Sequence, residues 1–326
     1  MIRGDKMNIS AIKLNNEVTP QGFSISPFTI NPRLQVIKLS SETVKGFIEQ
    51  ALPLGVQAIE YKPFLRFHVA SILNQLTNDT LGSLLLSIIK NRDTGAFMLQ
   101  CEPVTAEFDQ LEFNILLSTA VSHLIGVPNL DAMYGKFYAR FSVKNEDNSD
   151  SYLRQAHRRM ELHNDGTYVK ERTDWVIMQK IAEENMEGGD SLLLHVDEWQ
   201  DLEKFYNHPL AKEDIQWTSP ASKNVTYKIE HPVFFEEDDK GRPKMLFIDQ
   251  FAEPLNMRQG QYLYEMGTSL EAEKNTFNVR VPVGSMLVVN NHAWLHGRDK
   301  FVSDKGLYRE LLRQRGAYCE NAKLKQ

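Results

Sequence analysis

Cysteine and long apolar runs are both scarce in this sequence. Only two cysteines, Cys101 and Cys319, occur among 326 residues. Two cysteines so far apart build neither a disulfide framework nor a zinc ribbon, and as ordinary thiols they fit a reducing compartment. The longest apolar stretch, around residues 84–89, is far shorter than the roughly 20 residues of a membrane-spanning helix. The first residues carry no apolar signal-peptide core. We therefore expect a cytoplasmic protein with no membrane partner.

Positive charge is also in short supply. Lysine and arginine total 37 against 43 acidic residues, which gives a formal net charge of -6. This balance provides no general attraction for nucleic acid, so we expect none as a partner. Any preference for an acidic ligand must come from a local cluster of basic side chains. A glycine-rich turn between a strand and a helix is absent as well, which excludes a dinucleotide-binding fold.

The first third of the chain has apolar residues at helical spacing. Residues 41–51 begin with hydroxyl side chains that cap helices, and residues 64–76, 81–89 and 107–125 have similar patterns. From about Tyr134, short strand-like runs separated by turns replace this pattern. The predicted strands are residues 138–143, 175–180, 191–195, 245–249, 278–282, 285–290 and 309–318. Residues 197–206 and the segment after His208 have the pattern of helical insertions.

Many short strands after a helical segment predict an α+β chain around an antiparallel barrel or jelly roll. No repeat or linker divides the chain, and its length fits one large domain. We expect a single domain over residues 1–326, with a mainly helical part over residues 1–130. Residues 131–326 would form the jelly-roll core with insertions.

A histidine and an aspartate stand two residues apart in His163-Asn164-Asp165. In a strand such residues share a face, so an imidazole and a carboxylate can reach one metal ion. Much later in the chain, His296 offers a second imidazole, with His292 as the alternative. Two histidines and one carboxylate leave coordination positions of an iron ion open. Each signal is weak alone, because a solvated turn and a packed core histidine explain the same residues.

Three arginines follow in residues 309–315 (RELLRQR). In an extended strand, Arg309, Arg313 and Arg315 share one face with Leu311. Guanidinium groups bind carboxylates in bidentate pairs, so this face can hold dicarboxylates beside a metal ion. In a helix, Arg309 and Arg313 would still be neighbours. The alternative is a basic stripe on the surface.

Ser191 stands at the start of a predicted strand, directly after Gly188-Gly189-Asp190. A hydroxyl at this point can hydrogen-bond a bound carboxylate. The glycine pair also occurs in plain turns, so the motif alone does not identify a site.

Longer strings around these residues resemble the Fe(II)/2-oxoglutarate oxygenases and, within them, the glutarate 2-hydroxylase (CsiD) family. The resemblance runs from about residue 22 to residue 316. It includes residues 160–169 (MELHNDGTYV), 188–195 (GGDSLLLH), 294–301 (WLHGRDKF) and 309–316 (RELLRQRG). Strings of this length are far more specific than the H-x-D triplet. The tail after Gly316 shows no such resemblance.

The resemblance implies a role for each candidate residue. His163, Asp165 and His296 would ligate Fe(II). Arg309 would pair with the distal carboxylate of the cosubstrate 2-oxoglutarate, and Ser191 would help to hold it, although relatives often have threonine there.

By the same resemblance, Arg313 would contact the substrate anion, with Arg315 as a further candidate. The residues alone do not divide the roles among the three arginines.

The resemblance also implies a double-stranded β-helix, that is, a jelly-roll core with flanking helices, and a homotetramer. The implied reaction hydroxylates glutarate at C2 to L-2-hydroxyglutarate while 2-oxoglutarate and O2 become succinate and CO2, in lysine and glutarate breakdown. Two alternatives remain open. One is a hydroxylase for another anionic acid or amino acid. The other is a jelly-roll protein that senses a dicarboxylate, although a sensor needs no open metal positions.

Overall fold

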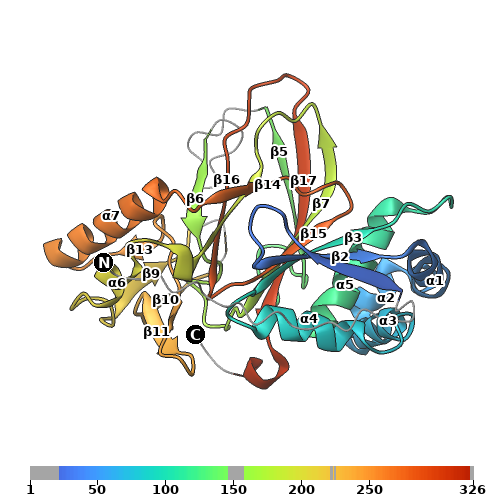
Figure 1. Ribbon diagram of the computed structural model, residues 1–326, viewed down its shortest axis with the longest axis horizontal. Helices are drawn as coiled ribbons and strands as arrows, with labels where there is room; N and C mark the ends of the chain where they lie inside the picture. Colours follow the sequence, from blue (N-terminus) through green and yellow to red (C-terminus); the bar gives the residue numbers. More distant parts are fainter. Residues whose placement is uncertain (1–21, 146–157, 221–222, 224, 324–326) are drawn as a thin grey trace, which may run out of the picture.

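Two β-sheets packed face to face form the centre of the molecule, and helices cover the larger sheet (Figure 1). The computed structural model describes residues 22–145, 158–220, 223 and 225–323. The large sheet has the order β1–β2–β3–β15–β7–β17–β4, and β5 also pairs with β17. Its strands are β1 (Phe23–Pro27), β2 (Leu34–Leu39), β3 (Ala96–Cys101), β15 (Met286–Asn290), β7 (Trp175–Glu184), β17 (Tyr308–Ala317), β4 (Val127–Pro128) and β5 (Ala139–Lys144).

The small sheet has the order β14–β8–β16–β6. Its strands are β14 (Phe277–Val279), β8 (Ser191–His195), β16 (Trp294–Arg298) and β6 (Met160–His163). Strand β15 shows how the two layers are separated. Leu287 and Val289 lie in the core between the sheets, whereas Met286 and Val288 pack against the helices. This alternation follows from the two-residue period of a strand that is buried on both faces.

Helices cover the outer face of the large sheet (Figure 1). They are α1 (Ser41–Ala51), the 3-10 turn Leu52–Leu54, α2 (Val56–Tyr61), α3 (Pro63–Gln75), α4 (Leu81–Lys90) and α5 (Gln110–Ile125). Helix α5 is buried on nearly all sides because it lies between the other helices and the sheet. Its Ser118 hydroxyl accepts a hydrogen bond of 3.0 Å from Gln314 on β17. In the described part of the chain, no helix combines the length and apolar character needed to cross a bilayer.

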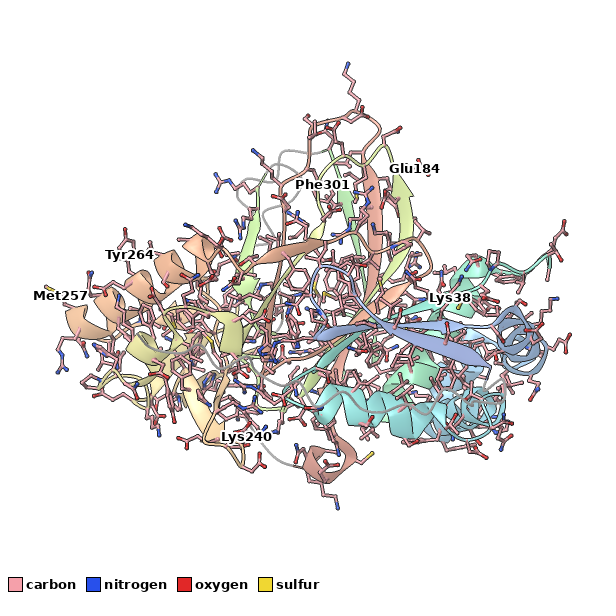
Figure 2. The ribbon with its side chains drawn as sticks, in the orientation of Figure 1. Lys38, Glu184, Lys240, Met257, Tyr264 and Phe301 are labelled. Carbon is pink, nitrogen blue, oxygen red and sulfur yellow. The ribbon has the colours of Figure 1, made fainter. Side chains whose placement is uncertain are left out.

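A smaller region with its own apolar core packs against the small sheet, at the left of Figure 1. It contains α6 (Leu202–Tyr206), β9 (Ile215–Thr218), β10 (Lys228–His231), β11 (Phe234–Glu237), β12 (Pro243–Met245), β13 (Ala252–Glu253) and α7 (Met257–Ala272). Helix α7 buries Tyr262, Met266 and Leu270 at helical spacing. Its Met257 and Tyr264 project outward (Figure 2).

Most predicted elements are present to within a few residues. The predicted helices correspond to α1, α3, α4 and α5, and six of the predicted strands correspond to β5, β7, β8, β14, β15 and β17. The helical insertion predicted at residues 197–206 overlaps the 3-10 turn Val196–Glu198 and contains α6. Strands β1, β2 and β3 and helix α7 are additions that the sequence pattern did not predict. The three strands extend the large sheet within the first third of the chain.

Two predicted elements are wrong. A strand was predicted at residues 245–249, but β12 ends at Met245, where that strand would begin. The peptide groups after Met245 do not pair with a neighbouring strand. Phe247 N–H donates to Asn164 Oδ1 at 2.9 Å, and Asn164 N–H donates to the Phe247 carbonyl at 2.8 Å. The segment after His208 is not helical. There the His208 ring accepts the Leu210 N–H at 3.1 Å, and the chain turns into β9.

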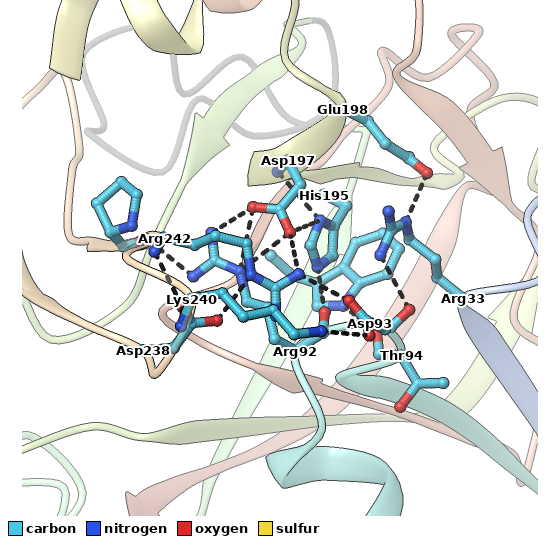
Figure 3. Close-up of polar contacts among 12 residues, drawn as sticks. Arg33, Arg92, Asp93, Thr94, His195, Asp197, Glu198, Asp238, Lys240 and Arg242 are labelled. Carbon is cyan, nitrogen blue, oxygen red and sulfur yellow. Dashed lines mark hydrogen bonds and ion pairs between the residues drawn. The ribbon is translucent and has the colours of Figure 1, made fainter. Parts of the chain in front are cut away.

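An ion-pair network connects the helical part of the chain to the end of β8 (Figure 3). Asp197 accepts from Arg92 at 2.6 Å and from Arg242 at 3.1 Å. His195 accepts the Asp197 N–H through Nδ1 at 3.1 Å, so its Nε2–H donates to the Arg92 carbonyl at 2.8 Å. Burial lowers the pKa of His195 to about 3, which keeps the ring neutral. The network fixes the end of the strand that begins at Ser191.

Candidate metal centre

Two histidines and an aspartate meet on the inner face of the small sheet. His163 ends β6 and pairs with His296 of the antiparallel strand β16, while Asp165 lies two residues after His163. One possible ligand atom from each of the three lies within 4.8 Å of the other two. His163 Nε2 is 4.0 Å from Asp165 Oδ1, and the centres of the two imidazole rings are 4.4 Å apart. The structure therefore gathers the three residues that the sequence singled out.

Hydrogen bonding and charge prepare these side chains for a metal ion. His163 Nδ1 lies 2.8 Å from the Glu161 carbonyl, so it carries the proton and leaves the Nε2 lone pair facing the cluster. Burial lowers the pKa of His296 to about 3, so this imidazole is neutral. Burial alone would raise the pKa of Asp165, but the charge of the Arg313 guanidinium opposes it and holds that pKa well below its usual range. Two imidazoles and a carboxylate form the donor set of a non-haem iron site.

Two asparagines hold the loop that carries Asp165. Asn291 accepts the Asp165 N–H at 2.9 Å and donates to the carbonyls of Asp165 and Thr173 at 2.8 and 2.9 Å. Asn164 donates to the carbonyls of Asn291 and Trp294 at 2.6 and 3.1 Å. Both asparagines are fully buried. Their amides replace the regular ladder where the chain must leave β6 and turn Asp165 inward.

The arginines of β17 lie on the face that points away from the helices. The other face carries Leu312, which packs in the helical core, and Gln314, which donates to α5. The segment is a strand, so the helical alternative is excluded. A β-bulge on β7 shifts the pairing register of β7 and β17 between Glu310 and Leu311, the segment that lies between Arg309 and the other two arginines.

Arg313 contacts the candidate metal ligand directly. Its Nη1 lies 3.1 Å from Asp165 Oδ2, and its Nη2 lies 3.1 Å from Asp131 Oδ2. Its guanidinium lies 4.9 Å from the centre of the Phe141 ring. The two carboxylates raise the pKa of Arg313 against the effect of burial, so it stays charged.

Further polar groups surround Arg313. Arg315 interacts electrostatically with Asp165, and its Nε is buried with no hydrogen-bond partner in the described part of the chain. Burial raises the pKa of Tyr168, which also interacts with both arginines. Burial lowers the pKa of Lys223 to about 8, and its Nζ lies 5.3 Å from the Phe141 ring centre. The area beside Asp165 therefore has an excess of positive charge.

Arg309 belongs to a second basic area, built around Phe301 (labelled in Figure 2). The guanidiniums of Arg298 and Arg309 lie 4.9 and 5.9 Å from the centre of this ring. Burial lowers the pKa of Arg309 to about 10, which leaves it charged at neutral pH. Its Nε is buried without a hydrogen-bond partner among the described residues. Ser191, buried on β8, lies opposite Arg298 of β16.

The glycine before Asp190 has a steric role. A Cβ atom on Gly189 would lie 2.0 Å from Cε1 of Phe301, and its φ of +67° favours glycine. The Gly-Gly-Asp sequence is therefore more than a plain turn, because it lets the Phe301 ring approach the start of β8.

His292, the alternative distal ligand, lies outside the cluster. Its Nε2 is 3.4 Å from Asp174 Oδ1, and its ring packs edge-on against Phe235. The cluster of possible metal donors in the described residues contains His296 instead.

Sequence reasoning missed the residues that support the site. These are Asn164, Asn291, Asp131, Tyr168 and Lys223. One signal was available, because two consecutive asparagines, Asn290 and Asn291, stand at the end of the apolar strand β15. Buried amides at the end of such a strand need specific partners.

Solved structures of other proteins share this fold. An asparagine oxygenase in complex with Fe(II), 3-hydroxyasparagine and succinate has a TM-score of 0.65 and 16% sequence identity, covering 86% of this chain and 93% of its own. The non-haem iron oxygenase OrfP, in complex with Fe and α-ketoglutaric acid, gives the same values. The prediction of an α+β fold with a jelly-roll core and flanking helices is confirmed.

Closer relatives identify the family. The CsiD family model matches residues 23–318, and the chain belongs to this family. The glutarate 2-hydroxylase of Salmonella typhimurium (strain SL1344) is 49% identical over 314 residues, covering 95% of this chain and 96% of its own. The glutarate 2-hydroxylase of Klebsiella pneumoniae (strain 342) is 50% identical over 302 residues and covers 92% of each chain.

Proposed function

We propose that this protein is an Fe(II)/2-oxoglutarate-dependent dioxygenase that hydroxylates glutarate at C2 to L-2-hydroxyglutarate. The observation that carries the proposal is the cluster of His163, Asp165 and His296 beside the inward arginine face of β17. Relatives about half identical over nearly the whole chain bear the name glutarate 2-hydroxylase. 2-Oxoglutarate and O2 are converted to succinate and CO2 in the same reaction.

The three clustered side chains would hold the iron. Their donor types fit Fe(II), and the orientation of His163 and the charge of Asp165 suit a divalent cation. When bound, the iron supplies the oxygen chemistry that proteins lack. The residues around it bind and orient the two diacids and keep water away.

Each of the two basic areas binds one of the two diacids. Arg309 and Ser191 bind the distal carboxylate of 2-oxoglutarate, because the buried Arg309 Nε needs an acceptor. Arg313 and Arg315 bind the substrate carboxylate. Asp131 and Asp165 use only two of the five N–H donors of Arg313. Glutarate differs from 2-oxoglutarate only at C2, so paired carboxylate sites suit both.

The deciding experiment mixes anaerobic Fe(II)-loaded protein with 2-oxoglutarate and O2, with and without glutarate. We expect succinate and 2-hydroxyglutarate in equal amounts, with the L isomer as the product. A His296→Ala variant should lose this turnover, and the matched His292→Ala variant should retain iron binding.

Two other outcomes would point to other functions. Succinate formation that does not depend on glutarate would favour a hydroxylase for another anionic acid or amino acid, and substrate profiling would identify it. No succinate under any condition would contradict the proposal and favour a dicarboxylate-sensing protein.

We further propose the setting in which the enzyme works. It is a single oxygenase domain over residues 1–326 that acts in the cytoplasm, in lysine and glutarate breakdown, without a nucleic-acid partner. It assembles as a homotetramer, for which the exposed aromatic side chains of Tyr61, Phe64 and Phe67 offer contact surface. Light scattering coupled to size exclusion tests the assembly, and a monomer would refute it.

A further inference from the structure

Asp131 is a buried carboxylate beside the site, with two defined contacts. It follows the short strand β4, and its side chain is 11% exposed. Its Oδ1 accepts the Met133 N–H at 3.1 Å, and its backbone N–H donates to the Lys136 carbonyl at 2.7 Å. Its Oδ2 accepts from Arg313 Nη2 at 3.1 Å. The turn therefore holds the carboxylate rigidly, with one oxygen directed at Arg313.

Arg313 is fixed on three sides by this arrangement. One nitrogen donates to Asp131, another donates to Asp165, and the planar group lies over Phe141. A guanidinium donates in a fixed planar geometry, so fixing one nitrogen also fixes the other. The position of Asp131 therefore sets the direction from which Arg313 reaches Asp165.

This direction gives the two oxygens of Asp165 different surroundings. Oδ2 lies 3.1 Å from Arg313 Nη1, whereas Oδ1 lies farther from this nitrogen, at 3.5 Å, and 4.0 Å from His163 Nε2, on the side of the metal-binding cluster. A carboxylate whose one oxygen is held more closely by a guanidinium offers the other oxygen more readily to a metal ion. One-oxygen ligation leaves more positions free for small ligands of the metal.

Charge gives Asp131 a second role. A buried arginine with Asp165 as its only partner would compete with a cation for that carboxylate. Asp131 supplies a second negative charge to Arg313, so the arginine can orient Asp165 without neutralising it.

We infer that Asp131 is a positioning residue that fixes Arg313 and thereby limits Asp165 to one metal-facing oxygen. The inference rests on the proposed function, because it takes Asp165 as a metal ligand. Asp131 itself touches neither the candidate metal ligands nor a substrate.

The test measures Mn(II) binding to the metal-free protein, without 2-oxoglutarate or O2. Asp131→Asn should raise the Mn(II) dissociation constant by about 10- to 100-fold, the usual effect of removing a group that orients a metal ligand. Asp131→Glu, which keeps the charge, should recover most of the affinity. The matched control is Asp304→Asn. Like Asp131, Asp304 accepts the backbone N–H of the residue two positions later, which here is Gly306, at 2.7 Å. Unlike Asp131, it is exposed and lies in the loop before β17.

A double-mutant cycle with Arg313→Met shows whether Asp131 acts through Arg313. If Asp131 acted on the metal only through space, Asp131→Asn would have the same effect with Arg313 and with Arg313→Met. The interaction energy from the cycle would then be zero. We expect the effect of Asp131→Asn to shrink by about tenfold when Arg313 is absent. As a second measurement, Asp131→Asn enzyme should form more succinate per hydroxylated product.

Two results would overturn the inference. One is an Asp131→Asn dissociation constant within about twofold of that of Asp304→Asn, and the other is additive effects in the cycle. Failure of the proposed function gives a different result, because wild-type protein would then bind no Mn(II) and form no succinate. Thermal melting of each variant confirms that it is folded when it is measured.

Discussion

Replacing Asn291 by alanine should damage both the fold and the metal centre. The side chain is fully buried and makes three hydrogen bonds, all to backbone groups. Two of them hold the peptide groups on either side of the Asp165 Cα, and the third holds Thr173. Alanine leaves these three groups without that partner in a place that water reaches poorly.

The expected magnitude follows from this count. Each buried polar group left without a partner costs about 1–3 kcal/mol. Three such groups predict a loss of about 3–5 kcal/mol in the free energy of unfolding, once some relaxation is allowed. The freed loop also changes the direction of Asp165, so the affinity for a divalent metal should fall by about 10- to 100-fold.

The neighbouring residue provides a matched control. Asn290 accepts the His292 N–H at 3.0 Å and donates to the Ile89 carbonyl at 3.0 Å, away from Asp165. Asn290→Ala should cost about 1–3 kcal/mol in stability but leave metal affinity unchanged. Urea unfolding of the metal-free proteins and Mn(II) titration separate the two effects. Equal metal affinity in both variants would refute the role of Asn291 in holding the metal loop.

Other changes should act on the anion site, the turn before β8 and the response to acid. Arg309→Met should raise the KM for 2-oxoglutarate by about 100-fold, since a buried charge pair is worth about 2–5 kcal/mol; an unchanged KM in steady-state succinate assays would exclude this contact. Gly189→Ala should lower stability by about 1–3 kcal/mol, because its Cβ would overlap Phe301, and calorimetry should show a lower melting temperature. Burial lowers the pKa of His195 to about 3 in the folded state, against about 6.5 when unfolded. As the pH falls, protons therefore bind to His195 of the unfolded chain first. The stability that the neutral, buried ring contributes is fully present above about pH 6.5 and is lost as the pH falls towards 3. Urea unfolding between pH 7 and pH 4 should show a smaller loss for His195→Gln than for wild type, and parallel curves would contradict this assignment.

Local patterns in the sequence predicted much of the fold. Capping residues and apolar spacing located α1, α3, α4 and α5, because a helix depends on residues within a turn or two. The two-residue period of strands also predicted that the arginines of β17 share a face. Helix α7 was not predicted from the sequence because it is polar over much of its surface. Its cap, with Asn256 accepting the Gln259 N–H at 3.0 Å, is a short-range signal that was available.

The sequence by itself determined which side chains are available for the chemistry. It contains the H-x-D triplet, a distal histidine and three arginines at strand spacing, and strings that resemble one family. These features are readable because each lies within a few residues of chain, where geometry follows from the local backbone.

Only the tertiary structure decided how these groups are supported. It groups His296, and not His292, with His163 and Asp165, it places Asn291 in hydrogen-bond contact with Asp165, and it pairs Asp131 with Arg313. Each of these contacts joins segments that are distant in the chain. No local pattern encodes such a contact, because its geometry depends on how all the intervening strands pair.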